Sequence, residues 1–247
     1  MNRIFATKII IIISLIIITF SGCTSVNQKN DITASDNLTA EDILNVNTIQ
    51  NLTPPGNITQ ISTTQYYIEN GETKSAQSII CAENKDGNIW IYGADPNNGT
   101  WFVLSPEYYY TVLDPTDESG THLGVQKNQT DITYDEYQNY LSDYNDILEL
   151  NGIKDPEISS ISQDDSEYTV IFTERLNKSD QYASYYKRTF NINEDDIIIN
   201  RKLILDKDNL QVKNIIVYFE TKNYPETIES KTTVSHPETI PDINLIN

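Results

Sequence analysis

The sequence predicts an α+β protein in which a strongly curved antiparallel β-sheet has helices on one face. From about residue 60 onward, short runs alternate with the period of two that is typical of β-strands. Turn signals such as Asn70-Gly71 and Asp86-Gly87 separate these runs, so neighbouring strands are expected to run antiparallel. Two other segments begin with the capping residues that are typical of helix starts.

Strands are expected where β-branched and aromatic residues lie between turn signals. The runs expected as strands are residues 60–68, 74–82, 89–92, 101–104, 108–113, 157–161, 168–173, 182–192, 197–205, 212–219 and 229–234. Several of these runs are apolar on both sides, since Trp90 and Tyr92 alternate with Ile89 and Ile91. Both faces of the sheet therefore need cover, or the sheet curls around something apolar, which favours strong curvature.

Two helices are expected beside the sheet. Thr39 precedes acidic residues and predicts a short helix from residue 40 to about residue 52, ended by Pro54-Pro55. Thr133 and Glu136 form a capping box that opens a longer helix over residues 133–151. Its apolar side recurs every three or four residues and is expected to pack on the sheet or, alternatively, to line an apolar cavity. That side consists of Tyr134, Tyr137, Tyr140, Leu141, Tyr144, Ile147 and Leu148.

The N-terminus carries an export signal. Arg3 and Lys8 flank an apolar run over residues 9–20, which is too short to span a bilayer because a span needs about 20 apolar residues. Small residues then lead to Cys23, and this pattern resembles the lipobox of prokaryotic lipoproteins, although Phe20 stands where the motif usually has Leu, Val or Ile. The resemblance implies removal of residues 1–22 and lipid attachment at Cys23; the alternative is an ordinary cleaved signal followed by an incidental cysteine.

The organisation that follows is a signal peptide over residues 1–22, a lipid-bearing Cys23 with a flexible tether to residue 38, and one domain over residues 39–247. If Cys23 is acylated, Cys81 has no partner for a disulfide, so the fold needs a true hydrophobic core. Six Asn-x-Ser/Thr triplets offer glycan sites in a cell that glycosylates asparagine. They begin at Asn37, Asn51, Asn57, Asn98, Asn128 and Asn177.

Composition argues against several classes of function. The formal net charge of −19 repels nucleic-acid phosphates, so no nucleic-acid partner is expected. The two histidines, His122 and His236, lie in polar surroundings, and no nucleophile elbow, zinc-binding motif or phosphate loop occurs. Acidic clusters in turns do not match a calcium loop. We therefore expect no enzyme, no catalytic residue, no metal and no cofactor.

Two segments and the order of elements carry a resemblance to a known group. Residues 86–92 (DGNIWIY) and residues 203–213 (LILDKDNLQVK) resemble a strand and a hairpin of the LolA/LppX/LprG-like superfamily of lipoprotein and lipid carriers. Carriers of this type often have an arginine on the second strand; residues 74–80 have none, so no such residue is carried over.

The resemblance implies an unclosed half-barrel whose concave side is plugged by helices and holds acyl chains. The expected protein is a lipid-anchored lipoprotein on the extracytoplasmic side of the cell membrane that binds or passes a lipid or a lipoprotein acyl chain. The alternatives are a surface scaffold or adhesion module with a filled interior, and a sensor domain held near a protein partner. The residues expected to line an apolar cavity are Trp90, Tyr92, Trp101, Val103, Tyr137, Leu141, Tyr144, Phe172, Leu203 and Leu205.

Overall fold

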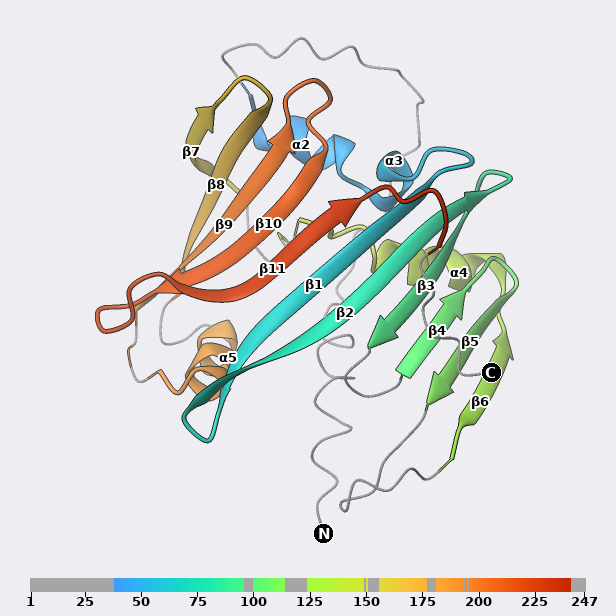
Figure 1. The fold of residues 1–247 in the computed structure, drawn as a ribbon, viewed down its shortest axis with the longest axis horizontal. Coiled ribbons are helices and arrows are strands. Elements are labelled where there is room, and N and C mark those ends of the chain that lie inside the picture. The colour runs from blue at the N-terminus through green and yellow to red at the C-terminus, as the bar shows by residue number, and fades with distance from the viewer. Residues whose placement is uncertain are drawn as a thin grey trace.

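Eleven strands form a single antiparallel sheet in the computed structural model (Figure 1). The structure describes residues 38–95, 100–113, 124–148, 150, 156–176, 181–192, 194 and 196–240; Cys23 and the signal lie outside them. The strand order is β6-β5-β4-β3-β2-β1-β11-β10-β9-β8-β7, so β6 and β7 are the two edges and the curled sheet stays open. The predicted fold class, an α+β protein with a curved, unclosed antiparallel sheet, is confirmed.

The elements have the following bounds. The strands are β1 (Ile58–Glu69), β2 (Glu72–Lys85), β3 (Asn88–Asp95), β4 (Thr100–Leu104), β5 (Tyr108–Leu113), β6 (Gln126–Asp131), β7 (Ile158–Gln163), β8 (Glu167–Leu176), β9 (Ile197–Asp206), β10 (Val212–Glu220) and β11 (Thr227–Ser235). The helices are α2 (Ala40–Val46), α3 (Ile49–Leu52), α4 (Tyr134–Ser142) and α5 (Gln181–Thr189).

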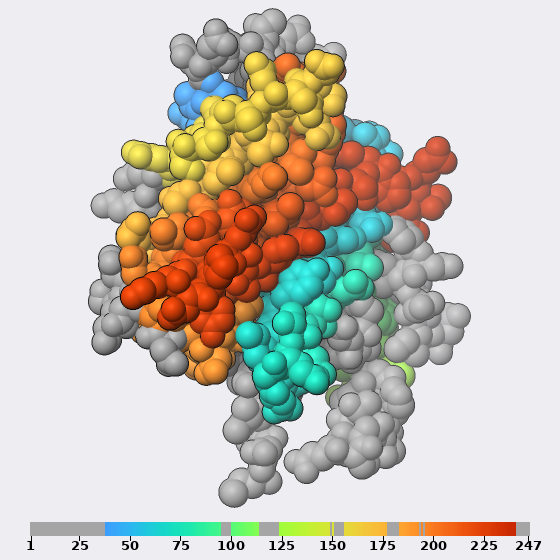
Figure 2. Space-filling model, turned by 60° about the vertical axis from the view of Figure 1, so that its left-hand side comes forward, coloured from blue at the N-terminus to red at the C-terminus, as the bar shows by residue number. Residues whose placement is uncertain are grey.

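Strand pairing follows the turn chemistry of the sequence. β1 and β2 are the longest strands and are joined by Asn70 and Gly71, whose φ angles of 54° and 80° suit a tight hairpin turn. β11 pairs with β1 and so joins the strands of the first half of the chain to those of the second. Figure 2 shows this junction on the surface, with β11 (red) beside β1 and β2 (cyan to turquoise).

The helices pack on one face of the sheet, which we call the inner face; the other is the outer face. Ile43 of α2, Tyr137 of α4 and Tyr186 of α5 belong to the same buried cluster as the strand residues Ile91 and Val217. Side chains alternate between the two faces along a strand, so these contacts fix the face of every neighbouring residue. The inner face is therefore where the core lies.

Asn47 fastens the first helix to the sheet. Its side chain is 1% exposed, its amide nitrogen donates to the carbonyls of Ile43 at 2.8 Å and Leu210 at 3.0 Å, and its amide oxygen accepts from the Val212 nitrogen at 2.7 Å. These bonds explain why the expected helix over residues 40–52 is divided. Asn47 leaves the helix to reach the β9–β10 turn, and Thr48 caps a new helix, α3.

The helix expected over residues 133–151 is shorter than predicted. The capping box of Thr133 and Glu136 is present, but α4 ends at Ser142. Beyond it, the backbone nitrogens of Asp143 and Tyr144 donate to carbonyls only three residues earlier, those of Tyr140 and Leu141. The chain therefore leaves the α-helix in a tighter turn. Asp and Asn side chains compete with helical hydrogen bonding, which accounts for the early end of α4 in this Asp- and Asn-rich segment.

The strand expected over residues 182–192 is wrong, because residues 181–189 form helix α5. Aromatic residues favour strands, which explains the error. The buried residues Ala183, Tyr186 and Phe190 instead recur with helical spacing, and Phe190 packs on Phe219 of β10 with ring centroids 4.7 Å apart. Strand β6 was not expected, since every residue in it is polar and exposed.

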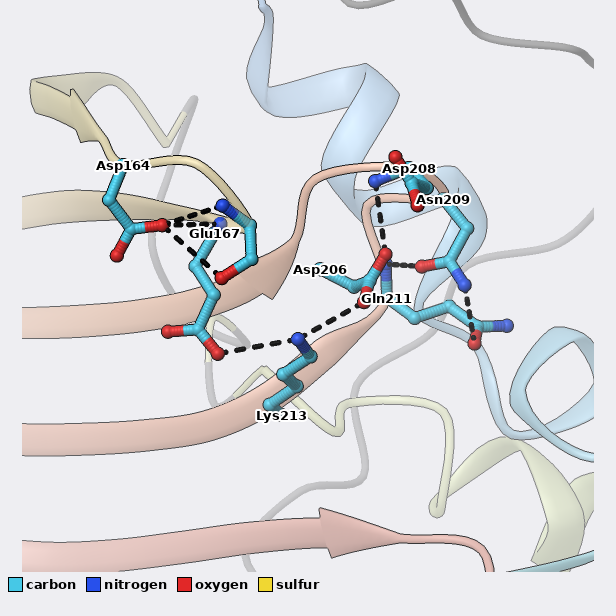
Figure 3. A network of polar contacts seen from close by, with 8 residues as sticks. Asp164, Glu167, Asp206, Asp208, Asn209, Gln211 and Lys213 are labelled. Carbon is cyan, nitrogen blue, oxygen red and sulfur yellow. Dashed lines mark hydrogen bonds and ion pairs between the residues drawn. The ribbon is translucent and has the colours of Figure 1, made fainter.

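The segment over residues 203–213 forms the β9–β10 hairpin. Lys213 makes ion pairs with Asp206 at 3.1 Å and with Glu167 of β8 at 3.3 Å (Figure 3). Asp206 also accepts from the nitrogen of Asp208 within the turn. The acid and the lysine of this motif therefore link β8, β9 and β10 at one end of the sheet.

Candidate functional site

The inner face is unevenly covered, and its least covered part is the candidate site. Under α5 the strands are sealed, since Phe172 is 1% exposed and Phe219 is fully buried. Toward β1 and β2 the cover thins, because Ile61 and Ile80 are only partly buried and Ser78, on the same face as Ile80, is exposed. Within the ranges that the structure describes, the apolar part of the inner face between α4 and α5 is thus only partly covered, and we call it the open part.

Four rings, which we call the aromatic strip, border this open part. Tyr144 stacks on Phe102 with centroids 6.1 Å apart and planes at 28°, and Phe102 lies 5.9 Å from Tyr109. Tyr109 stacks on Tyr140 at 5.7 Å and 16°. Tyr140 is 44% exposed, so the outer end of the strip meets solvent.

Gly93 sets the position of Phe102. The two residues lie opposite each other in β3 and β4, and the Phe102 ring lies across the glycine. A Cβ at position 93 would stand 2.0 Å from a Phe102 ring carbon, which no real pair of atoms tolerates. Only glycine therefore lets this ring lie flat against the sheet and stack on Tyr144.

Burial affects the phenols of both Tyr109 and Tyr144. Burial is the largest cause that raises the pKa of Tyr109, and the neighbouring phenol of Tyr140 adds to it. Burial also raises the pKa of Tyr144, still more strongly, and the neighbouring Tyr109 and Asp143 add to it in that order. Both phenols are thus neutral at physiological pH, and each can donate one hydrogen bond.

Tyr137 anchors α4 beside the strip. Its hydroxyl donates to the Ile89 carbonyl at 2.8 Å and accepts from the Ile89 nitrogen at 3.1 Å. β4 pairs with β3 only from Ile91 onward, so the tyrosine replaces a missing strand partner. Tyr137 and Leu141 belong to the closed core, and the open part of the face begins beyond them.

The α5 side of the open part is polar. Gln65 of β1 donates to the Tyr185 hydroxyl at 2.8 Å, and the Tyr186 hydroxyl donates to the Glu229 carboxylate at 2.5 Å. Burial is the largest cause that raises the pKa of both tyrosines, and the charge of the Glu229 carboxylate adds to it. These bonds hold α5 against β1 and β11.

The ten residues expected to line a cavity do not lie together. Tyr137, Leu141, Tyr144, Phe172, Leu203 and Leu205 are on the inner face, and all but Tyr144 are buried in the closed core. Trp90, Tyr92, Trp101 and Val103 lie on the outer face, because they alternate with the core residues Ile89, Ile91 and Leu104. These four residues therefore do not border the open part of the inner face.

On the outer face the tryptophans make a separate cluster. Trp90 meets Tyr108 edge to face at 5.9 Å, and Trp101 meets Tyr110 in the same manner at 5.3 Å. The Lys85 ammonium lies 4.6 Å from the centre of the Trp90 ring and 2.9 Å from Glu83. The rings shield one another here, and the helices that the structure describes pack on the other face.

The sequence interpretation missed Phe102, Tyr109, Ile61 and Ile80. Phe102 and Tyr109 lie in predicted strands, but the sequence favours the larger tryptophans beside them as the lining. The alternation itself contained the information, since Phe102 shares a face with Leu104. The sequence does not show which of the two faces α4 covers.

Within residues 38–240, over the ranges that the structure describes, no helix is long and apolar enough to cross a membrane. The same ranges contain no group of three or more His, Cys, Asp or Glu side chains placed to hold a metal ion.

No model of a protein family matches this chain. No curated protein matches it. Among solved structures, it is similar to the LolA superfamily protein NE2245 from Nitrosomonas europaea, with 9% identity, 83% of this chain and 96% of that chain covered, and a TM-score of 0.26. It is also similar to LprF from Mycobacterium bovis, with 13% identity, 82% and 95% covered, and a TM-score of 0.33.

A third similar structure is a DUF1329 family protein from Desulfovibrio piger, with 10% identity, 83% and 92% covered, and a TM-score of 0.28. At these identities and TM-scores the similarity by itself says nothing of function.

Proposed function

We propose that this chain is a lipid-anchored protein on the extracytoplasmic side of the membrane that holds an apolar ligand, such as a lipid acyl chain, on the open part of its inner face. The observation that carries the proposal is the partly buried apolar surface of Ile61, Ile80 and the aromatic strip. Apolar surface of this kind gains about 25 cal/mol per Å² when a ligand removes it from water. Binding without chemistry also fits the absence of the familiar catalytic motifs from the sequence.

Anchoring supports the same role. An acyl group on Cys23 would hold the domain near a bilayer, since residues 24–38 span at most about 50 Å when fully extended. The ligand of the inner face would then be taken from, or delivered to, that bilayer.

Two neighbouring isoleucines of β2 test the binding site. Ile80 faces the open inner surface, whereas Ile79 faces outward, and both are partly buried. We expect Ile80→Ser to weaken binding of a fluorescent fatty acid to the purified protein and Ile79→Ser to leave it unchanged. Equal affinities of the two variants, or no binding by the unaltered protein, would contradict the site.

The anchor is tested by fractionation of cells that make the protein. Cys23→Ser is expected to move the protein from the membrane fraction to the soluble extracytoplasmic fraction. Cys81→Ser is the matched control, because Cys81 is a buried thiol of the domain. Membrane attachment that survives Cys23→Ser would remove the anchor from the proposal.

A surface scaffold with a filled interior is the second candidate. It is favoured by the continuous packing of α4 on the sheet, where Tyr137 is 1% and Leu141 3% exposed. Native mass spectrometry separates the two functions. A protein that is released from its own membranes without any bound lipid, and that takes up none from vesicles, favours the scaffold.

A further inference from the structure

We infer that Asn128, on the edge strand β6, is an acceptor for an asparagine-linked glycan. Three of the Asn-x-Ser/Thr triplets of the sequence, those at Asn51, Asn57 and Asn128, lie within the described residues. All three end in threonine, so the motif itself does not distinguish them, but the fold does. The inference goes beyond the proposed function and does not depend on it.

The chemistry of glycan transfer requires access to the whole triplet. The side-chain Nδ2 of the asparagine forms a bond to the anomeric carbon of a sugar and loses a proton, while a lipid-linked diphosphate leaves that carbon. A transferase that carries out this step binds the triplet in its own active site. The asparagine and the threonine two residues later must therefore both be reachable from solvent.

The fold withholds the triplets at Asn51 and Asn57. Asn51 lies in helix α3, where its Nδ2 donates to a backbone carbonyl of α2 at 2.5 Å, and Thr53 is fully buried. Asn57 is exposed, but the hydroxyl of the fully buried Thr59 donates to the Leu52 carbonyl at 2.5 Å. Either triplet can enter an enzyme only after buried side chains have left the core.

The triplet at Asn128 is accessible along its whole length. Every residue of β6 is exposed, and this includes Asn128, Gln129 and Thr130. β6 is the last strand at one edge of the sheet (Figure 1) and, among the described strands, pairs with β5 alone. Because β6 buries none of its side chains, its local release from the sheet takes none of them out of the core.

Glycan transfer to the folded protein tests the inference. The purified protein is incubated with a single-subunit oligosaccharyltransferase that requires only the triplet and with an oligosaccharide linked to a polyprenyl diphosphate. Mass spectrometry of peptides then measures the occupancy of each triplet over time. Three synthetic peptides, over residues 47–55, 53–61 and 124–132, give the rate of each triplet outside the fold. Relative to its own peptide, Asn128 should be modified at least about 10-fold faster than Asn51 and Asn57.

Two variants of β6 are the matched controls. Gln129→Ala keeps the triplet and should keep the glycan, whereas Thr130→Ala removes the threonine and should abolish modification of Asn128. A smaller ratio of relative rates, or folded protein that accepts no glycan at Asn128, overturns the inference. Neither result bears on the ligand of the inner face, so the proposed function is tested separately.

Discussion

Replacing Tyr137 by phenylalanine removes one oxygen from the interior and leaves two backbone groups without a partner. The hydroxyl serves both the nitrogen and the carbonyl of Ile89, at 3.1 and 2.8 Å. Ile89 is 3% exposed and Tyr137 is 1% exposed, so water cannot take over without opening the contact between α4 and β3. The ring and its packing are unchanged, which isolates the polar contribution.

Each buried backbone group that loses its partner costs about 1–3 kcal/mol, so Tyr137→Phe should lower the free energy of unfolding by about 2–6 kcal/mol. For a domain of this size, 1 kcal/mol corresponds to about 2–4 °C in Tm, which gives a fall of roughly 4–24 °C. Urea and thermal unfolding of the purified protein, followed by circular dichroism, measure both quantities.

Tyr134→Phe is the control, since Tyr134 lies one turn earlier on α4 and is 58% exposed. It should change the free energy of unfolding by less than about 0.5 kcal/mol. A difference of 2 °C corresponds to about 1 kcal/mol or less. If the two variants melt within 2 °C of each other, the Tyr137 hydroxyl is not a needed hydrogen-bond partner of the Ile89 backbone.

Three further predictions concern other parts of the fold. Gly93→Ala forces the Phe102 ring from the sheet, so a loss of about 1–3 kcal/mol in urea unfolding is expected, and unaltered stability would contradict the close contact. Burial raises the pKa of Asp206, but the hydrogen bond and charge of Lys213 outweigh it and hold the pKa below 3.8. The stability that this pair contributes is present above that pH and is lost as the pH falls. Between about pH 4 and pH 2 the free energy of unfolding should therefore fall more for the unaltered protein than for Asp206→Asn. Equal falls in the two proteins would refute the pairing. Burial raises the pKa of Cys81 to about 11, so at pH 8 a thiol reagent should label it only in denaturant, as mass spectrometry would show.

Local turn and cap chemistry made most of the sheet predictable. The Asn70-Gly71 turn, the capping box at Thr133 and the alternation in β9 and β10 each have a physical signal that acts within a few residues. β6 has no such signal, because an exposed edge strand such as Gln126–Asp131 has no apolar face to reveal its period.

Two other differences needed the tertiary structure. The aromatic residues of α5 suit a strand as well as a helix, and contact with Phe219 of β10 favours the helix. In β3 and β4 the alternation divides the residues into two faces. The buried cluster that Tyr137 and Leu141 form with Ile91 and Leu104 shows which face α4 covers. Four of the ten residues expected to line a cavity, Trp90, Tyr92, Trp101 and Val103, therefore lie on the face that α4 does not cover.

The fastening of α2 by Asn47 has a mechanical consequence if the proposed anchor at Cys23 holds the chain. A pull on the segment that precedes Leu38 enters the domain at α2 and would otherwise pass through α3 straight to β1. The two hydrogen bonds from Asn47 to Leu210 and Val212 would divert that tension to the β9–β10 hairpin. Strand β1 would then carry less load, and the register of β1 with β2 and β11 would be protected from a pull at the proposed anchor.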